Sequence, residues 1–195
     1  MVAIFIVDST LIGGMKLKTL NLDKLNIGLP TITPVFCKML VEAAVFCLEH
    51  NQHQSGKCIL YCAEDINDLI MLDWTKNDPR VIDTYGDLQE VTEYGATGMA
   101  VLLAVENTAY TTVSRSFKEF GFDYWIGDKD DLSSSFQRKA RLEISGILKG
   151  NDSIFKSRIK QKMAQTDKSD SMNLDCYVSV IDFASPKASL VRKGV

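Results

Sequence analysis

The sequence lacks the short motifs on which many small-molecule enzymes depend. It contains no glycine-rich phosphate loop and no nucleophile elbow. Histidine is scarce, because His50 and His53 are the only two in 195 residues, and they do not form a catalytic pair. These absences leave little support for an enzyme that acts on a small molecule.

An excess of positive charge is missing as well. The 25 aspartates and glutamates outnumber the 22 lysines and arginines, which gives a formal net charge of −3. Any basic surface for nucleic acid would therefore have to be local. The hydrophobic fraction of 46% and the charged fraction of 24% are ordinary for a globular chain, and 195 residues suffice for one substantial domain or two small ones.

The sequence also shows no pattern of a secretory signal or a membrane span. Residues 1–8 are apolar over too few positions and lack a basic segment before them, so we read them as a first strand. The cysteines form no CxxC pair and lie in apolar runs, which favours reduced, buried thiols in a cytoplasmic protein. They are Cys37, Cys47, Cys58, Cys62 and Cys176.

A zinc site is an alternative for part of this region. His50, His53, Cys58 and Cys62 have spacings that zinc ligands use. However, His50 is expected at the end of a helix, His53 in a turn and both cysteines on a strand. We therefore favour a polar helix end followed by a core strand.

The apolar pattern predicts a mixed α/β chain. A helix is expected from Pro34 to about His50, with proline in its first turn. Strands are expected at about 57–62 and 68–74. A second helix begins at Asp87, and Gly95 and Gly98 within it indicate that another backbone packs closely there.

After this helix the expected order is three strands, a helix and a strand. Their approximate ranges are 110–115, 121–127, 140–147, 152–165 and 176–183. The second strand carries Asp123 and the third carries Glu143, which shares a face with Arg141 and Ser145. Carboxylates are costly on a core strand unless something pairs with them, and two on neighbouring strands can hold one divalent cation.

This element order, with an Asp on the second strand and Glu-x-Ser on the third, resembles the PD-(D/E)XK nuclease superfamily. The superfamily includes many restriction endonucleases, Holliday-junction resolvases and bacterial defence nucleases. The resemblance covers about residues 87–183. It implies a restriction-endonuclease-like α-β-β-β-α-β core within residues 87–195, with residues 1–86 as an N-terminal α/β extension packed on it in one compact unit.

The resemblance also implies a metal site. Asp123 and Glu143 would hold Mg²⁺, which activates a water and stabilises the scissile phosphate. Glu90 or Glu93, on the preceding helix, would add a further acidic group. The sequence departs from the family pattern at Ser145, where the family has its lysine.

Several basic residues could replace that lysine. The candidates are Arg141, Lys156, Arg158, Lys160 and Lys162. Lys156 and Lys160 are four residues apart and form a stripe on the helix, which we assign to nucleic-acid binding. The apolar side chains Ile154, Ile159 and Met163 are then expected to point towards the core.

The resulting expectation is a cytoplasmic bacterial protein that binds or hydrolyses DNA or RNA with Mg²⁺, in a defence or mobile-element system. One alternative is a catalytically inactive nuclease-fold subunit that docks on a partner protein or forms a homo-oligomer. Another is that Asp123 and Glu143 lie on a solvated sheet face, with Glu143 paired to Arg141 or Lys139.

Overall fold

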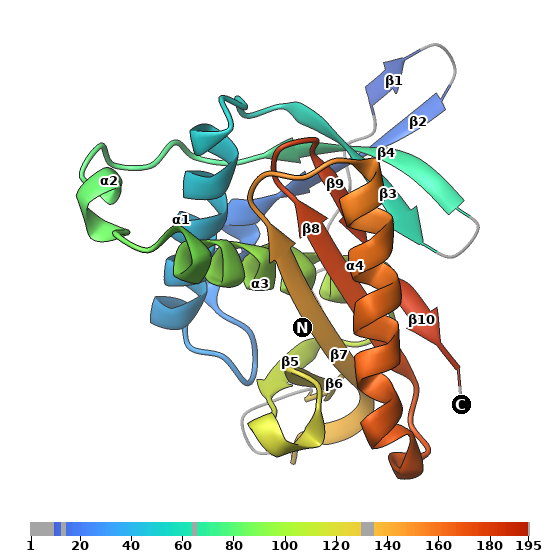
Figure 1. Ribbon diagram of the computed structural model, residues 1–195. Coiled ribbons are helices and arrows are strands. Elements are labelled where there is room, and N and C mark those ends of the chain that lie inside the picture. Colours follow the sequence, from blue (N-terminus) through green and yellow to red (C-terminus); the bar gives the residue numbers. More distant parts are fainter. Residues whose placement is uncertain (1–9, 13–14, 64–65, 130–134, 195) are drawn as a thin grey trace.

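The computed structural model describes residues 10–12, 15–63, 66–129 and 135–194, which form a mixed α/β fold (Figure 1). The strand expected at residues 1–8 lies outside the described residues. The helices are α1 (Pro34–His50), α2 (Val81–Thr84), α3 (Leu88–Asn107) and α4 (Asp152–Gln165). Short 3-10 helices are η1 (Leu22–Ile27), η2 (Lys118–Phe120) and η3 (Thr166–Met172). Among the described residues, no helix has the length and apolar character needed to cross a membrane.

The strands of the described residues belong to one ten-stranded mixed sheet. They are β1 (Thr10–Ile12), β2 (Met15–Asn21), β3 (Lys57–Ala63), β4 (Ile66–Asp73), β5 (Thr112–Arg115), β6 (Tyr124–Asp128), β7 (Gln137–Ile147), β8 (Cys176–Asp182), β9 (Lys187–Ser189) and β10 (Val191–Lys193). Their order is β1-β2-β4-β3-β9-β8-β7-β6-β5, and β10 also pairs with β8.

The second half of the chain has a simple topology. Strands β5, β6 and β7 form an antiparallel meander, and α4 then crosses to β8, which runs parallel to β7. A parallel neighbour requires such a crossover connection. The expected order of helix, three strands, helix and strand from Asp87 onward is therefore present, and the pairing joins these strands side by side.

A single hydrophobic core connects the two halves of the chain. One cluster of buried side chains contains Leu20 and Ile59 from the first half and Val91 and Ile181 from the second. Side chains from both halves of the chain therefore share one buried cluster.

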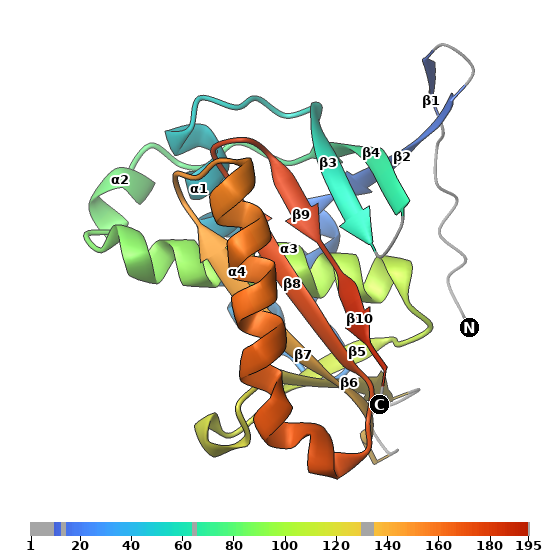
Figure 2. The ribbon, with the colours of Figure 1, turned by 45° about the vertical axis from the view of Figure 1, so that its right-hand side comes forward.

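Two helices hold the sheet between them. Figures 1 and 2 show α3 on one face of β7 and β8 and α4 on the other. Side chains on β7 alternate accordingly, because Leu142 and Ile144 join the main core whereas Glu143 and Ser145 bond to α4. Gly146 lets α3 approach, since a Cβ there would lie 2.6 Å from the carbonyl oxygen of Thr92.

Helix α3 is supported from behind by α1. A Cβ on Gly95 would lie 2.9 Å from the carbonyl oxygen of Ala43, and one on Gly98 would lie 2.8 Å from that of Leu40. The expected close approach of another backbone is confirmed.

We expect Gly98→Ala to lower the free energy of unfolding. The overpacked methyl group costs about 1–3 kcal/mol, which exceeds the gain of about 1 kcal/mol in helix propensity. Urea denaturation would measure the difference. Gly86→Ala is the control, because nothing lies within 4 Å of an added Cβ there. Stabilisation by Gly98→Ala would show that the two helices are not in tight contact.

Candidate active site

The candidate site lies where β6 separates from β7. The two strands pair from Asp128 and Gln137 up to Tyr124 and Leu142, and β7 then continues to Ile147 with β8 on its other side. Asp123 stands at this fork. Its backbone N–H donates to the Leu142 carbonyl oxygen at 3.1 Å, and its Oδ2 accepts the Ile144 N–H at 2.9 Å.

The Asp123 carboxylate therefore accepts the hydrogen bond that a backbone carbonyl oxygen would accept if the pairing with β7 continued beyond β6. The Ile144 N–H on this edge of β7 would otherwise need another acceptor, since buried backbone groups are nearly always paired. This local requirement fixes the Asp123 side chain beside Glu143, the residue that precedes Ile144.

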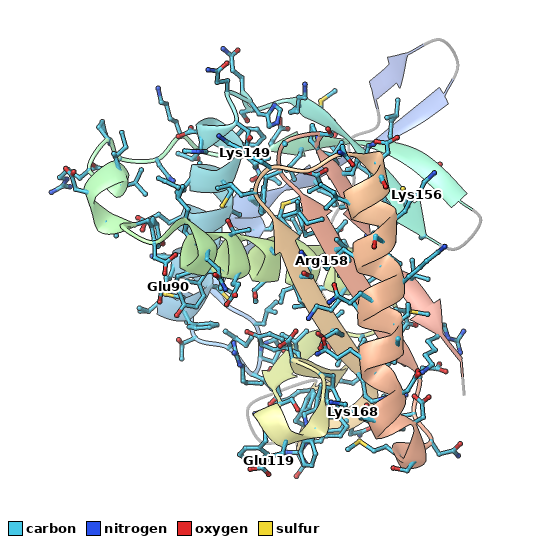
Figure 3. The ribbon with its side chains drawn as sticks, in the orientation of Figure 1. Glu90, Glu119, Lys149, Lys156, Arg158 and Lys168 are labelled. Atoms are coloured by element: carbon cyan, nitrogen blue, oxygen red, sulfur yellow. The ribbon has the colours of Figure 1, made fainter. Side chains whose placement is uncertain are left out.

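A cavity of about 860 Å³ opens at this edge of β7. Residues of α3, β5, β6, β7 and α4 line it, and Figure 3 shows the side chains of these elements. Its charged lining residues are three acids and three bases: Glu93, Asp123, Glu143, Arg115, Arg158 and Lys162. The site is thus a polar, charge-paired hollow between two helices.

Glu143 is the most deeply placed of the acids, with 1% of its surface exposed. Its Oε1 accepts hydrogen bonds from Lys162 Nζ at 2.6 Å and from Gln165 Nε2 at 2.9 Å. Its Oε2 is buried without a hydrogen-bond partner among the described residues. Burial and the nearby Asp123 carboxylate raise the pKa of Glu143 to about 7, against the opposing effect of Lys162.

Helix α4 delivers two cations to β7 in register. Arg158 donates to Ser145 Oγ at 2.8 Å, and Lys162 donates to Glu143. Two residues along a strand span roughly 6.6 Å and four along a helix span roughly 6 Å, so the two pairs match. Ser145, which stands at the lysine position of the motif, is therefore itself bonded to a cation from α4.

The structure brings some of the expected site residues together. Asp123, Glu143, Ser145 and Glu93 all line the cavity. Glu90 does not line it, and its Oε1 accepts instead from the Tyr94 hydroxyl at 3.3 Å.

The expected basic residues are placed differently. Arg141 is fully buried and lies outside the cavity, with its guanidinium bonded to Ser169, Asp170 and the Leu174 carbonyl oxygen. Lys156 and Lys160 are exposed and also lie outside it. In Figure 3, Arg158 lies on the side of α4 that faces β7, and Lys156 lies on the opposite side.

The solvated-face alternative for Glu143 is wrong, because this carboxylate is buried and paired with Lys162. Arg141 pairs with Asp170, and Lys139 pairs with Asp128 at 2.5 Å. The sequence analysis expected Arg141, Glu143 and Ser145 on one face of β7. It did not foresee that η3 covers this face at Arg141 and bonds to its guanidinium.

The alternative zinc site gains no support. His53 Nε2 lies 2.8 Å from the carbonyl oxygen of Phe183, and His50 stacks on Phe46. The side chain of Cys58 lies outside what the structure describes. Within the described part of the chain, no three His, Cys, Asp or Glu side chains gather closely enough to hold a metal ion.

Some lining residues were not foreseen. Gln161 and Gln165 continue the α4 face of Arg158 and Lys162 at helical spacing, so the pattern 158-161-162-165 was a usable signal. Arg115 had no such signal, because its position depends on the pairing of β5 with β6.

Comparison with known proteins does not identify a relative: no protein-family model, curated protein or solved structure matches the chain. The functional argument therefore depends on the geometry of the site.

The raised pKa of Glu143 predicts a pH-dependent stability of the metal-free protein. The unfolded chain releases this proton near the ordinary value of 4.5, whereas the folded protein keeps it to about pH 7. The free energy of unfolding should therefore fall as pH rises through this range, by about 3 kcal/mol at most.

Glu143→Gln should lack this fall, because glutamine does not ionise. Urea denaturation at steps between pH 4.5 and pH 7.5 would measure it, with the exposed Glu119→Gln as the matched control. Parallel pH curves for Glu143→Gln and the parent protein would refute the assignment.

Proposed function

We propose that this protein is a divalent-metal-dependent nuclease of the PD-(D/E)XK type, in which Lys162 on α4 replaces the lysine of the motif. One observation carries the proposal. Asp123, just before β6, and Glu143, on β7, meet in one cavity where Lys162 contacts one oxygen of Glu143 and the other oxygen is buried without a hydrogen-bond partner among the described residues. Two carboxylates beside a lysine are the groups that the resemblance requires.

The topology supports the same proposal. The antiparallel meander β5-β6-β7, followed by α4 and the parallel strand β8, has the element order expected of a restriction-endonuclease-like core. The positions of the acidic residues support it as well, since Asp123 immediately precedes the second of these strands, β6, and Glu143 lies within the third, β7.

The donor set fits a magnesium ion. Mg²⁺ keeps several waters and is usually held by only one or two carboxylates, so Asp123 and Glu143 suffice. An orphaned buried carboxylate oxygen such as Glu143 Oε2 demands a partner. When bound, a divalent cation would lower the pKa of a coordinated water and stabilise negative charge on a phosphate.

The cations of the chain then have separate tasks. Lys162 holds a positive charge 2.6 Å from Glu143, where it offsets the charge that develops on the phosphate during attack by water. Arg158, oriented by Ser145, offers a planar guanidinium that suits a phosphate oxygen. The proposed substrate is a phosphodiester of DNA or RNA. A bacterial defence or mobile-element setting rests on the resemblance alone.

Metal binding gives the first test. We expect Mg²⁺ or Mn²⁺ to raise the melting temperature, because a ligand that binds only the folded state stabilises it by about 2.7 kcal/mol at a hundredfold excess over Kd. For a chain of this length that corresponds to a rise of roughly 5–10 °C.

Asp123→Asn should remove this rise, whereas Asp83→Asn, on an exposed residue of α2, should retain it. An unchanged melting temperature of the parent protein would favour the catalytically inactive nuclease-fold subunit instead.

Cleavage gives the second test. With labelled DNA and RNA and either metal, Asp123→Asn and Glu143→Gln should reduce cleavage to background. Lys162→Ala should lower the rate by about 10²- to 10³-fold, the usual effect of removing one positioned charge donor. Lys160→Ala is the control, because it removes a lysine from the exposed face of the same helix, and it should change the rate no more than severalfold. A larger loss with Lys160→Ala than with Lys162→Ala would reject the role of Lys162.

A further inference from the structure

An exposed aromatic residue, Phe117, does not itself line the cavity but adjoins in sequence the segment that holds the site. Phe117 follows Ser116, whose backbone N–H donates to the Asp123 carbonyl oxygen at 2.8 Å. Two residues earlier in the chain, Arg115 lines the cavity. Phe117 is 69% exposed, so the ring lies on the surface within one residue of the backbone pair that holds Asp123.

The Phe117 ring rests on a firm aromatic base. It makes an edge contact with Phe120, with ring centroids 5.9 Å apart. Phe120 in turn stacks on Phe122 and meets Trp125 edge-on, and both of these rings are buried. Phe117 therefore contacts this aromatic cluster with one edge while most of its ring stays exposed to solvent.

Two arginines lie on either side of the acidic pair. Arg115 is in register with Tyr124 and, through it, with Leu142 on β7. Arg158 bonds to Ser145, three residues further along β7, or roughly 10 Å away along the strand. Arg115 shares a sheet face with Tyr124 and Leu142, and Arg158 meets Ser145 on the opposite face, so the two arginines approach the acidic edge of β7 from different faces of the sheet.

Both guanidinium groups are held in place by neutral partners. Arg115 donates to the Tyr124 hydroxyl at 3.0 Å and lies 5.2 Å from the centroid of the same ring. Arg158 donates to the Ser145 hydroxyl. These hydrogen bonds involve no carboxylate, so both guanidinium groups keep donors that can bind phosphate oxygens.

The size of the site limits the substrate. A cavity of about 860 Å³ is within the range of pockets that enclose one small ligand, roughly 300–1,000 Å³. Glu143 lies at its base with 1% exposure. A duplex is a stiff rod with its phosphates on the outside and does not enter such a hollow, whereas a flexible single strand can lower one phosphate into it.

We infer that the substrate is a single-stranded nucleic acid. Its backbone is held by Arg115 and Arg158 on either side of Asp123 and Glu143, and a base next to the cleaved bond stacks on Phe117. This inference rests on the proposed function and narrows its substrate class. Stacking on an aromatic ring tolerates any base, so the recognition is independent of sequence.

Binding without turnover tests the inference. Full-length protein carrying Glu143→Gln would be titrated, with Mg²⁺ present, into fluorescein-labelled oligothymidylate or oligouridylate of about 15 nucleotides, the upper end of usual single-strand site sizes. A duplex and an abasic strand of the same length are the comparison ligands. Fluorescence anisotropy reports each Kd.

The single strand, as DNA or RNA, should bind at least tenfold more tightly than the duplex. Phe117→Ala should weaken single-strand binding by roughly 5- to 150-fold, the usual loss of one stacked base, and should leave the abasic strand unaffected. Phe117→Trp should restore binding. Ile82→Ala, which removes an exposed side chain on the remote helix α2, is the matched control.

Equal affinity for the duplex and the single strand would overturn the inference. So would a failure to bind either the DNA or the RNA single strand. An equal effect of Phe117→Ala on the normal and abasic strands would overturn the role of Phe117. Failure of the proposed function is a separate result, since it appears as absent cleavage by the parent protein with either metal while single-strand binding persists.

Discussion

The buried carboxylate of Glu143, beside the half-buried Asp123, is the constraint on which the site depends. Glu143 is almost fully enclosed, and a charge taken out of water must be met by partners close at hand. Lys162 and Gln165 satisfy one oxygen, whereas the other has no hydrogen-bond partner in the part of the chain that the structure describes, and Asp123 adds a like charge nearby. This arrangement is unfavourable for stability in the absence of a cation. It is the kind of local strain that functional sites retain.

The helices behind Asp123 and Glu143 are held by close backbone contacts at glycines. Gly146 lets α3 cross β7, which brings Glu93 to the cavity, and Gly95 and Gly98 let α1 press on the back of α3. The N-terminal half therefore contributes to the site without supplying a residue to it. Since the same buried cluster spans both halves, a loss of packing behind α3 would be transmitted to the acidic edge of β7.

The sequence predicted the parts that depend on local patterns. The bounds of α1 and α4, the close contact at Gly95 and Gly98, and the shared face of Glu143 and Ser145 all follow from capping residues, propensity and strand alternation. Strands β9 and β10 were missed, because three residues each are too few to show a period. The buried role of Arg141 depends on η3, whose path over the strand has no local signal.

The expected buried side of α4 was right for two of its three residues, because Ile159 and Met163 pack against a buried cluster. Ile154 was expected to face the core, but Phe155 does so and Ile154 is 43% exposed. Lys156 and Lys160 are exposed, as expected, whereas Arg158 and Lys162 contact β7. Phe155 is the one buried residue described in α4, so amphipathicity could not show which of the basic residues meet the sheet.

The charges of the site bear on how an acidic protein could bind the proposed anionic substrate. The three acids of the cavity, Glu93, Asp123 and Glu143, formally balance its three bases, Arg115, Arg158 and Lys162. A neutral hollow does not attract a polyanion. Adding a divalent cation makes the same hollow positive by two charges, so phosphate affinity becomes conditional on the metal. The net charge of −3 would then disfavour nonspecific adsorption of nucleic acid elsewhere on the surface, so the proposed binding would depend on the metal-loaded site.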